Sequence, residues 1–110
     1  MSTTETNIAN QTCNDDCPVK KTAGIIEGKW TTLVVRELLL GKRRYSDLQR
    51  ALSGISPKIL TARLRLLEQR RLVTRTVYPT VPPATEYELT PLGRRLEGVI
   101  KAMAEFGSEL

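Results

Sequence analysis

The hydrophobic positions in the first half of the chain recur every three or four residues, which predicts a run of α-helices. The stretch 18–28 predicts a short helix that ends near Gly28. The stretch 29–41 places Trp30, Val34 and Leu38 on one face and ends at a second glycine. A third helix is expected from Ser46 to about residue 52, with Tyr45 and Leu48 turned inward.

A fourth helix is expected over residues 56–71, after the turn residues Ser53 and Gly54. Ser56 is a favourable N-cap, and Pro57 suits the first helical position because it has no N–H to leave unpaired. Both features fix where this helix begins.

Beyond this helix, the pattern changes from helical spacing to alternation. Residues 72–78 and 85–90 are rich in Val, Thr and Tyr and alternate in polarity, which predicts two strands. The three prolines between them exclude a helix and indicate a hairpin with a stiff tip. Thr90 and Pro91 then begin a last helix, which is expected to continue to residue 110.

This order of elements predicts a mainly α fold with a small β-hairpin, a winged helix-turn-helix. Residues 17–110 are expected to form this DNA-binding domain. The polar residues 1–16 are interpreted as a flexible N-terminal tail. In such a fold the second helix of the close pair, here residues 56–71, enters the major groove of DNA.

The expected reading helix has two different sides. Ile59, Leu60, Leu64, Leu66 and Leu67 spread over one side and are interpreted as core. Lysine and arginine can donate to guanine, glutamine pairs with adenine, and small methyl groups contact thymine. The opposite side carries residues of these kinds, and we expect it to contact bases: Lys58, Thr61, Ala62, Arg65 and Gln69.

A solvated charged face is the alternative for any amphipathic helix, but the neighbouring features favour DNA. Ser56 and Pro57 open a helix N-terminus that can meet a phosphate. Arg43 and Arg44, in a basic turn with Lys42, are expected to contact phosphates as well. Arg63 points toward the apolar side, so we expect a structural ion pair or a phosphate contact for its head group.

The wing is expected to contribute little. Arg75 on the first strand is expected to pair across the hairpin with Glu86 or Glu88. The tip carries no cation.

The amino-acid composition excludes several classes of function. The 110 residues carry 17 Lys and Arg against 12 Asp and Glu, a net charge of +5. This excess suits nucleic acid, although ordinary solubilising charge gives the same balance. Histidine is absent, which removes His-dependent catalysis and His-based metal sites. We therefore expect no enzyme, no metal and no cofactor.

The chain shows no targeting or membrane signal, so a cytoplasmic protein without a membrane partner is expected. Residues 1–16 lack the apolar segment of a secretory signal. The apolar run around Leu38 and Leu40 is far shorter than the roughly 20 residues of a membrane span.

The last helix predicts a homodimer. Its apolar stripe is longer than a domain of this size can cover, and packing on the chain's own core is the alternative. We expect the first and last helices to form the interface, with contributions from Val19, Ile25, Val99, Met103, Phe106 and Leu110. Two-fold symmetry then sets two reading helices about 34 Å apart, or a multiple of it, on double-stranded operator DNA.

Several short motifs in fixed order carry a family resemblance: CPV at residues 17–19, GKW at 28–30, GISPKIL at 54–60, and TVYPTVPPATEYELTPLG at 76–93. Over residues 17–107 the chain resembles the HxlR-type winged-helix regulators, which are related to the MarR group. The resemblance implies a dimeric repressor or activator that binds a pseudo-palindromic operator. The recognition helix would run from Ser56 to Gln69. One departure is Arg71, which stands where the family turn has glycine and should make the helix end less sharp.

The resemblance also implies that Cys17, the cysteine of the CPV motif, is a redox sensor. A helix start and Lys20 and Lys21 favour the thiolate, whereas the neighbouring aspartates disfavour it. Cys13 is a second candidate thiol. A buried, unreactive Cys17 at the dimer interface remains the alternative.

Two rival functions fit less well. A thiol-redox enzyme is disfavoured because the two cysteines have the spacing C-x-x-x-C without a βαβ pattern around it. A protein-interaction adaptor that has lost DNA binding would have an acidic or apolar recognition face, which Lys58 and Arg65 contradict.

Overall fold

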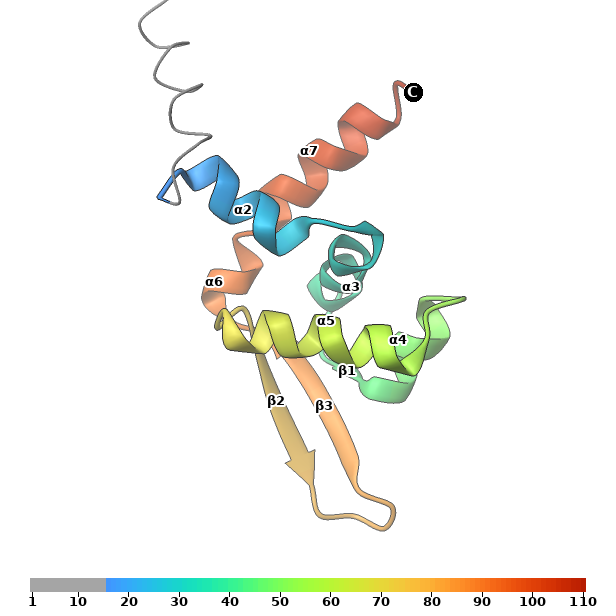
Figure 1. The fold of residues 1–110 in the computed structure, drawn as a ribbon. Helices are drawn as coiled ribbons and strands as arrows, with labels where there is room; N and C mark the ends of the chain where they lie inside the picture. The colour runs from blue at the N-terminus through green and yellow to red at the C-terminus, as the bar shows by residue number, and fades with distance from the viewer. Residues whose placement is uncertain (1–15) are drawn as a thin grey trace, which may run out of the picture.

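The structure is a computed structural model, and it describes residues 16–110. Their architecture is mainly helical with a small antiparallel sheet (Figure 1). The helices are α2 (Pro18–Ile26), α3 (Lys29–Leu39), α4 (Tyr45–Ala51), α5 (Pro57–Gln69), α6 (Pro91–Arg94) and α7 (Glu97–Gly107), and the strands are β1 (Arg43–Arg44), β2 (Val73–Tyr78) and β3 (Ala84–Leu89).

The core lies where α3, α4, α5 and the base of the sheet meet. Leu38 of α3 and Leu48 of α4 are fully buried, and so are Leu60 and Leu67 of α5. Tyr87 and Leu89 close the core from β3. The predicted apolar side of α5 is therefore core at its centre, while Ile59 and Leu66 at its flank are half-buried.

The sheet has a third strand that the sequence did not predict. The strand order is β1-β3-β2, and both neighbouring pairs are antiparallel. Arg43 and Arg44, expected in a turn, pair with Tyr87 and Glu86 of β3. Two residues are too few to show an alternating pattern in the sequence. The strand is recognised only by its pairing with the edge of β3.

The last helix is broken, where a continuous helix was expected. The N–H groups of Arg95 and Leu96 bond to the carbonyl groups of Leu92 and Gly93, three residues earlier, at 3.1 and 3.0 Å. These i→i+3 bonds form a tight 3₁₀-type turn between α6 and α7. Helical spacing is almost the same in both geometries, which explains why the pattern did not mark the break.

The end of α5 also differs from expectation. Arg71 was expected to make it less sharp. Instead Arg71 adopts a φ of 60°, and the chain turns directly into β2. The helix therefore ends as abruptly as it would with glycine.

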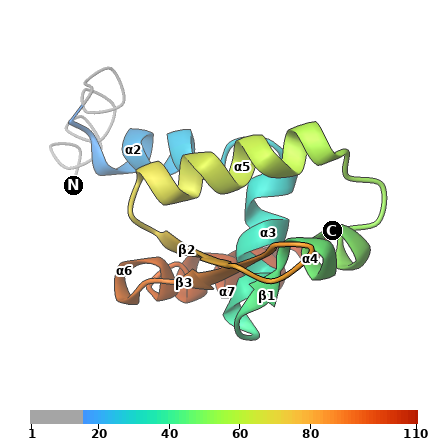
Figure 2. The ribbon, with the colours of Figure 1, turned by 90° about the horizontal axis from the view of Figure 1, so that it is seen from below.

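The elements lie in layers that leave α5 on the outside. Seen from below, α2 and α5 lie in one layer above the hairpin, whereas α6 lies beside the base of the hairpin and α7 overlaps it in this view (Figure 2). The β2–β3 hairpin extends away from the helices as a wing, and α7 extends in the opposite direction (Figure 1). One side of α5 is therefore open to a partner next to the wing.

The close approach between α6 and the start of β2 yields a stability prediction. A Cβ on Gly93 would overlap the backbone oxygen of Leu72, and it would lie 3.1 Å from a methyl group of Leu89. Gly93→Ala should therefore lower the free energy of unfolding by about 1–3 kcal/mol, the usual cost of overpacking. Denaturant unfolding measures the change.

Gly98→Ala is the matched control, because Gly98 lies in α7 with nothing within 4 Å of its Cβ position. Alanine favours a helix over glycine, so this change should raise stability by up to about 1 kcal/mol. Equal effects of the two substitutions would contradict the close approach at Gly93.

Candidate nucleic-acid interface

The N-terminus of α5 is built as the sequence predicted. The Ser56 Oγ accepts a hydrogen bond from the Ile59 N–H at 3.1 Å, and Pro57 takes the first helical position. One of the unpaired N–H groups of the first turn is thereby satisfied. Ser56 and Pro57 are both exposed, so this end of the helix is open to solvent.

The outer side of α5 presents most of the predicted reading residues together. Lys58, Ala62, Arg65 and Gln69 are exposed and lie on the side opposite the buried leucines. Within residues 16–110, no carboxylate lies within ion-pair distance of Lys58 or Arg65. Their charges are therefore available to an anionic partner.

Thr61 differs from the other four because it is half-buried and oriented by Tyr45. The Tyr45 hydroxyl donates to the Pro57 carbonyl at 3.1 Å and lies 3.3 Å from the Thr61 Oγ1. A phenol has one proton, so the Thr61 hydroxyl donates to the Tyr45 oxygen. Tyr45 thus ties α4 to the first turns of α5, a positioning role that the sequence did not reveal beyond its inward orientation.

The three cations of the predicted basic turn have different surroundings in the structure. Arg44 is exposed, and its backbone N–H donates to the Asp47 carboxylate at 3.2 Å, which fixes the start of α4. Arg43 is half-buried, and its guanidinium donates to the Lys42 carbonyl at 3.0 Å. The Lys42 ammonium lies 4.0 Å from Glu86. Arg44 is therefore the most available cation of the three.

A hollow of about 880 Å³ separates the wing from the start of α4, and Arg44 lines it on one side. Tyr78 and Pro82 of the hairpin also line this hollow. The Tyr78 hydroxyl donates to Glu86 at 2.8 Å, and this bond together with the Glu86 charge raises the pKa of Tyr78 above its usual 10.0. Tyr78 therefore stays protonated and neutral at physiological pH.

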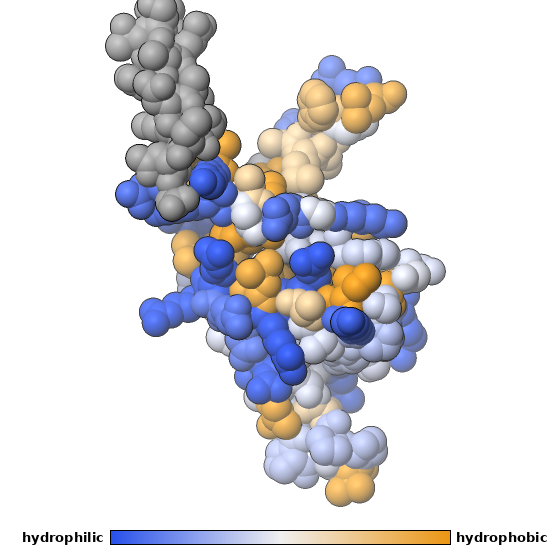
Figure 3. Space-filling view, in the orientation of Figure 1, coloured by the Kyte–Doolittle hydropathy of each residue, from blue (hydrophilic) through white to orange (hydrophobic). Residues whose placement is uncertain are grey.

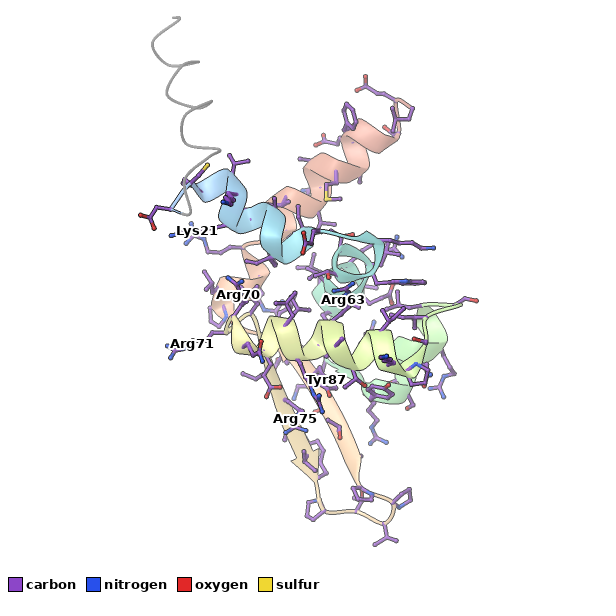
Figure 4. The ribbon with its side chains drawn as sticks, in the orientation of Figure 1. Lys21, Arg63, Arg70, Arg71, Arg75 and Tyr87 are labelled. Carbon is purple, nitrogen blue, oxygen red and sulfur yellow. The ribbon has the colours of Figure 1, made fainter. Side chains whose placement is uncertain are left out.

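Two predicted arginine contacts differ from expectation (Figure 4). Arg75 does not pair with Glu86 or Glu88 across the hairpin; its Nε lies 3.7 Å from Glu68 of α5. The reason is register, because Arg75 is directly opposite Tyr87 and therefore points to the side that faces α5. Burial by this packing is the main cause that raises the pKa of Tyr87.

Arg63 packs against the α2–α3 junction, and among residues 16–110 it forms no ion pair, which was one of the two contacts expected for its head group. Its Nη2 lies 3.7 Å from the position that a Cβ on Gly28 would take. Its Nε is buried, and no hydrogen-bond partner for it is found among residues 16–110. Arg63 is thus separate from the exposed side of α5.

Most residues of the predicted dimer interface are uncovered in the single chain. Phe106 is 68% exposed, Met103 44% and Leu110 94%, and Val19 of α2 is 62% exposed. Val99 is half-buried, and Ile25 packs in part against the chain's own core. The exposed apolar residues extend along the free part of α7 (Figure 3).

Of the two cysteines, Cys17 is buried, with 3% of its surface exposed, and its sulfur is a free thiol. It occupies the N-cap position of α2. Cys13 lies outside the described residues.

Residues 16–110 contain neither a helix that could span a membrane nor a cluster of metal-ligating side chains. Over residues 16–110, no helix has the length and apolar character to cross a bilayer. In the same range, no three potential metal-ligating side chains (His, Cys, Asp or Glu) come together.

Known proteins resemble this chain in both sequence and fold. Residues 25–110 match the model of the HxlR-like helix-turn-helix family. An HTH-type transcriptional regulator of Synechocystis sp. is 45% identical over 93 residues, which cover 84% of this chain and 69% of that protein.

Two solved structures share the fold. A MarR-family transcriptional regulator from Porphyromonas gingivalis W83 has a TM-score of 0.82 and 42% identity, covering 87% of this chain and 94% of its own. The redox regulator HypR in its oxidized form has a TM-score of 0.78 and 39% identity, covering 86% and 97%. The predicted winged helix-turn-helix is thereby confirmed, and the chain belongs to the HxlR-like helix-turn-helix family of transcriptional regulators.

Proposed function

We propose that this regulator binds a pseudo-palindromic operator as a homodimer and reads the major groove with α5. The observation that carries the proposal is the exposed side of α5, where Lys58 and Arg65 lack carboxylate partners in the described chain. These side chains can donate to guanine O6 and N7. Gln69 and Ala62 on the same side supply an amide for adenine and a methyl group for thymine.

Phosphate contacts would hold α5 in register. Arg44 beside the wing hollow and the open N-terminus of α5 at Ser56 are suited to the DNA backbone. Arg43 is half-buried and its guanidinium is bonded to the Lys42 carbonyl, so it would contribute less than Arg44.

The dimer would form through α2 and α7. All residues from Lys101 to Leu110 are exposed in the single chain, including the apolar Met103 and Phe106. A shallow apolar hollow of about 360 Å³ on α2, lined in part by Val19 and Ile26, lies open as well. Burial of these apolar surfaces against a second copy would supply the free energy of association.

The proposed redox response rests on Cys17. Oxidation of two thiols forms one disulfide and transfers two electrons and two protons to the oxidant. A link between subunits at the start of α2 would rotate them and change the separation of their reading helices. The 39% identity to HypR, a redox regulator, supports this proposal. The low exposure of Cys17 requires that the start of α2 opens before an oxidant reaches the thiol.

Replacement of Arg65 tests the base contacts. Arg65→Ala should weaken operator binding by roughly 1–3 kcal/mol, because alanine cannot form the bidentate hydrogen bonds to a base. Fluorescence anisotropy at fixed salt, with DNA from upstream of the regulator's own gene, measures the affinity.

The matched control is Arg36→Ala, because Arg36 is also an exposed helical arginine but lies on α3 beside Glu37. Its removal should leave operator affinity nearly unchanged. If Arg65→Ala binds as tightly as the wild type, α5 does not read bases through this residue.

A charge on α7 tests the dimer. Phe106→Asp should convert the dimer to a monomer, because a carboxylate would be buried without a partner at the interface. Operator binding should be abolished as well, since one half-site lacks the affinity of two joined sites. Sedimentation at micromolar concentration measures the assembly.

Val81→Asp provides the control, since Val81 is an equally apolar and fully exposed residue at the tip of the wing. This variant should remain a dimer. A wild-type protein that sediments as a monomer would rule the dimer out.

Oxidation tests the thiol. After treatment with diamide, the wild type should show a disulfide-linked species on non-reducing gels together with altered operator affinity. Cys17→Ser should show neither change. Cys13→Ser shows whether Cys13 also takes part in the disulfide. Unchanged wild-type mobility and affinity would leave Cys17 as a packing residue only.

A further inference from the structure

Arg71, at the end of α5, has a backbone conformation that an arginine rarely adopts. Its φ is 60°, and it is the one non-glycine residue of the described chain with a positive φ. In this left-handed region the Cβ approaches the following carbonyl oxygen, which is unfavourable for most residues but not for glycine, which has no Cβ. The side chain therefore imposes a cost on the fold.

Hydrogen bonds around residue 71 fix the left-handed backbone conformation of Arg71. The Leu72 N–H donates to the Leu67 carbonyl at 2.9 Å, and the Arg71 N–H donates to the Glu68 carbonyl at 3.0 Å. These two bonds form the Schellman motif, which places its left-handed residue at position 71. The Thr90 hydroxyl also donates to the Arg71 carbonyl at 2.8 Å. Glycine at position 71 would keep every one of these bonds and relieve the strain.

The Arg71 side chain does not offset this cost within the described chain. It is exposed, and no ion pair or hydrogen bond involves its guanidinium among residues 16–110. The neighbouring Arg70 is likewise exposed and unpaired in the same range. Figure 4 shows Arg70 and Arg71 at the C-terminal end of α5, where Lys21 of α2 also lies.

The length of α5 explains why cations at this end are useful. Its 13 residues span about 20 Å at 1.5 Å each. The major groove is only about 12 Å wide. Where a helix of this length crosses the groove, the residues just beyond it, here Arg70 and Arg71, would come near a phosphate backbone. The C-terminal end of a helix carries a partial negative charge, which repels phosphate unless nearby cations offset it.

We propose that Arg71 contacts a DNA phosphate at the C-terminal end of α5, with Arg70 beside it, and that its strained backbone is retained for this contact. The inference rests on the proposed DNA binding and extends the interface beyond the base-reading side of α5. A phosphate contact of this kind adds affinity without sequence preference. A random-sequence DNA duplex is therefore a sufficient probe.

Arg71→Gly tests both parts of the proposal in one protein. Its melting temperature should rise by about 4 °C, because the strain is relieved. Its affinity for the duplex should fall roughly fivefold at 0.15 M salt, and the slope of log K against log salt should shrink by about 0.9, the value for one phosphate that is no longer neutralised.

Two further variants separate charge from strain. Arg71→Lys keeps the charge and the β-carbon, so its melting temperature and salt slope should match the wild type. Arg70→Gly removes the same charge at a residue whose φ of −85° carries no such strain. Its melting temperature should therefore fall rather than rise.

The outcomes distinguish this inference from the proposed function. If the wild type binds DNA with a steep salt dependence and Arg71→Gly has the same slope, the phosphate contact is wrong and DNA binding stands. If Arg71→Gly melts at a lower temperature, Arg71 serves the helix dipole and the proposal is wrong. A wild type that binds neither the operator nor the random-sequence duplex overturns the proposal together with DNA binding.

Discussion

The packing of α5 on α3 and α4 is the constraint on which the rest of this molecule depends. Leu60, Leu64 and Leu67 occupy one side of α5 and are removed from water. Burial of each such side chain contributes roughly 2 kcal/mol. Since this side must face the core, the opposite side of the same helix must face outward. The exposure of Lys58 and Arg65 thus follows from the position of three leucines.

A second constraint connects the end of α5 to the C-terminal helices through Thr90. Its hydroxyl donates to the Arg71 carbonyl and accepts from the Gly93 N–H at 3.0 Å, and its backbone N–H donates to the Leu72 carbonyl at 3.0 Å. Gly93 packs closely against the same carbonyl of Leu72. One residue therefore joins the end of α5, the start of β2 and α6. The start of the C-terminal helices is therefore fixed to the end of α5 at this corner.

Cationic side chains of the described residues differ in whether a carboxylate lies nearby. Arg75 faces Glu68, Arg50 bonds to Asp47 at 2.6 Å, and Lys42 lies near Glu86, so their charges are partly offset within the chain. On α5 and at its C-terminal end, by contrast, Lys58, Arg65 and the Arg70–Arg71 pair have no carboxylate within ion-pair distance among residues 16–110. Net charge alone did not reveal this division, because it depends on which carboxylates the fold brings within about 4 Å, the reach of a direct ion pair.

The sequence by itself determined the first four helices, their order, the N-cap of α5 at Ser56 and the hairpin that follows, because local spacing and capping chemistry encode these features. It also determined that Lys58, Ala62, Arg65 and Gln69 share the outer side of α5, since helical geometry fixes that arrangement. Only the tertiary structure decided the short β1 strand, the turn between α6 and α7, the partner of Arg75, the packing of Arg63 on the α2–α3 junction, and the strained backbone of Arg71. Each of these depends on residues far apart in the chain or on hydrogen bonds that no local pattern specifies, so they appear only when the elements pack together.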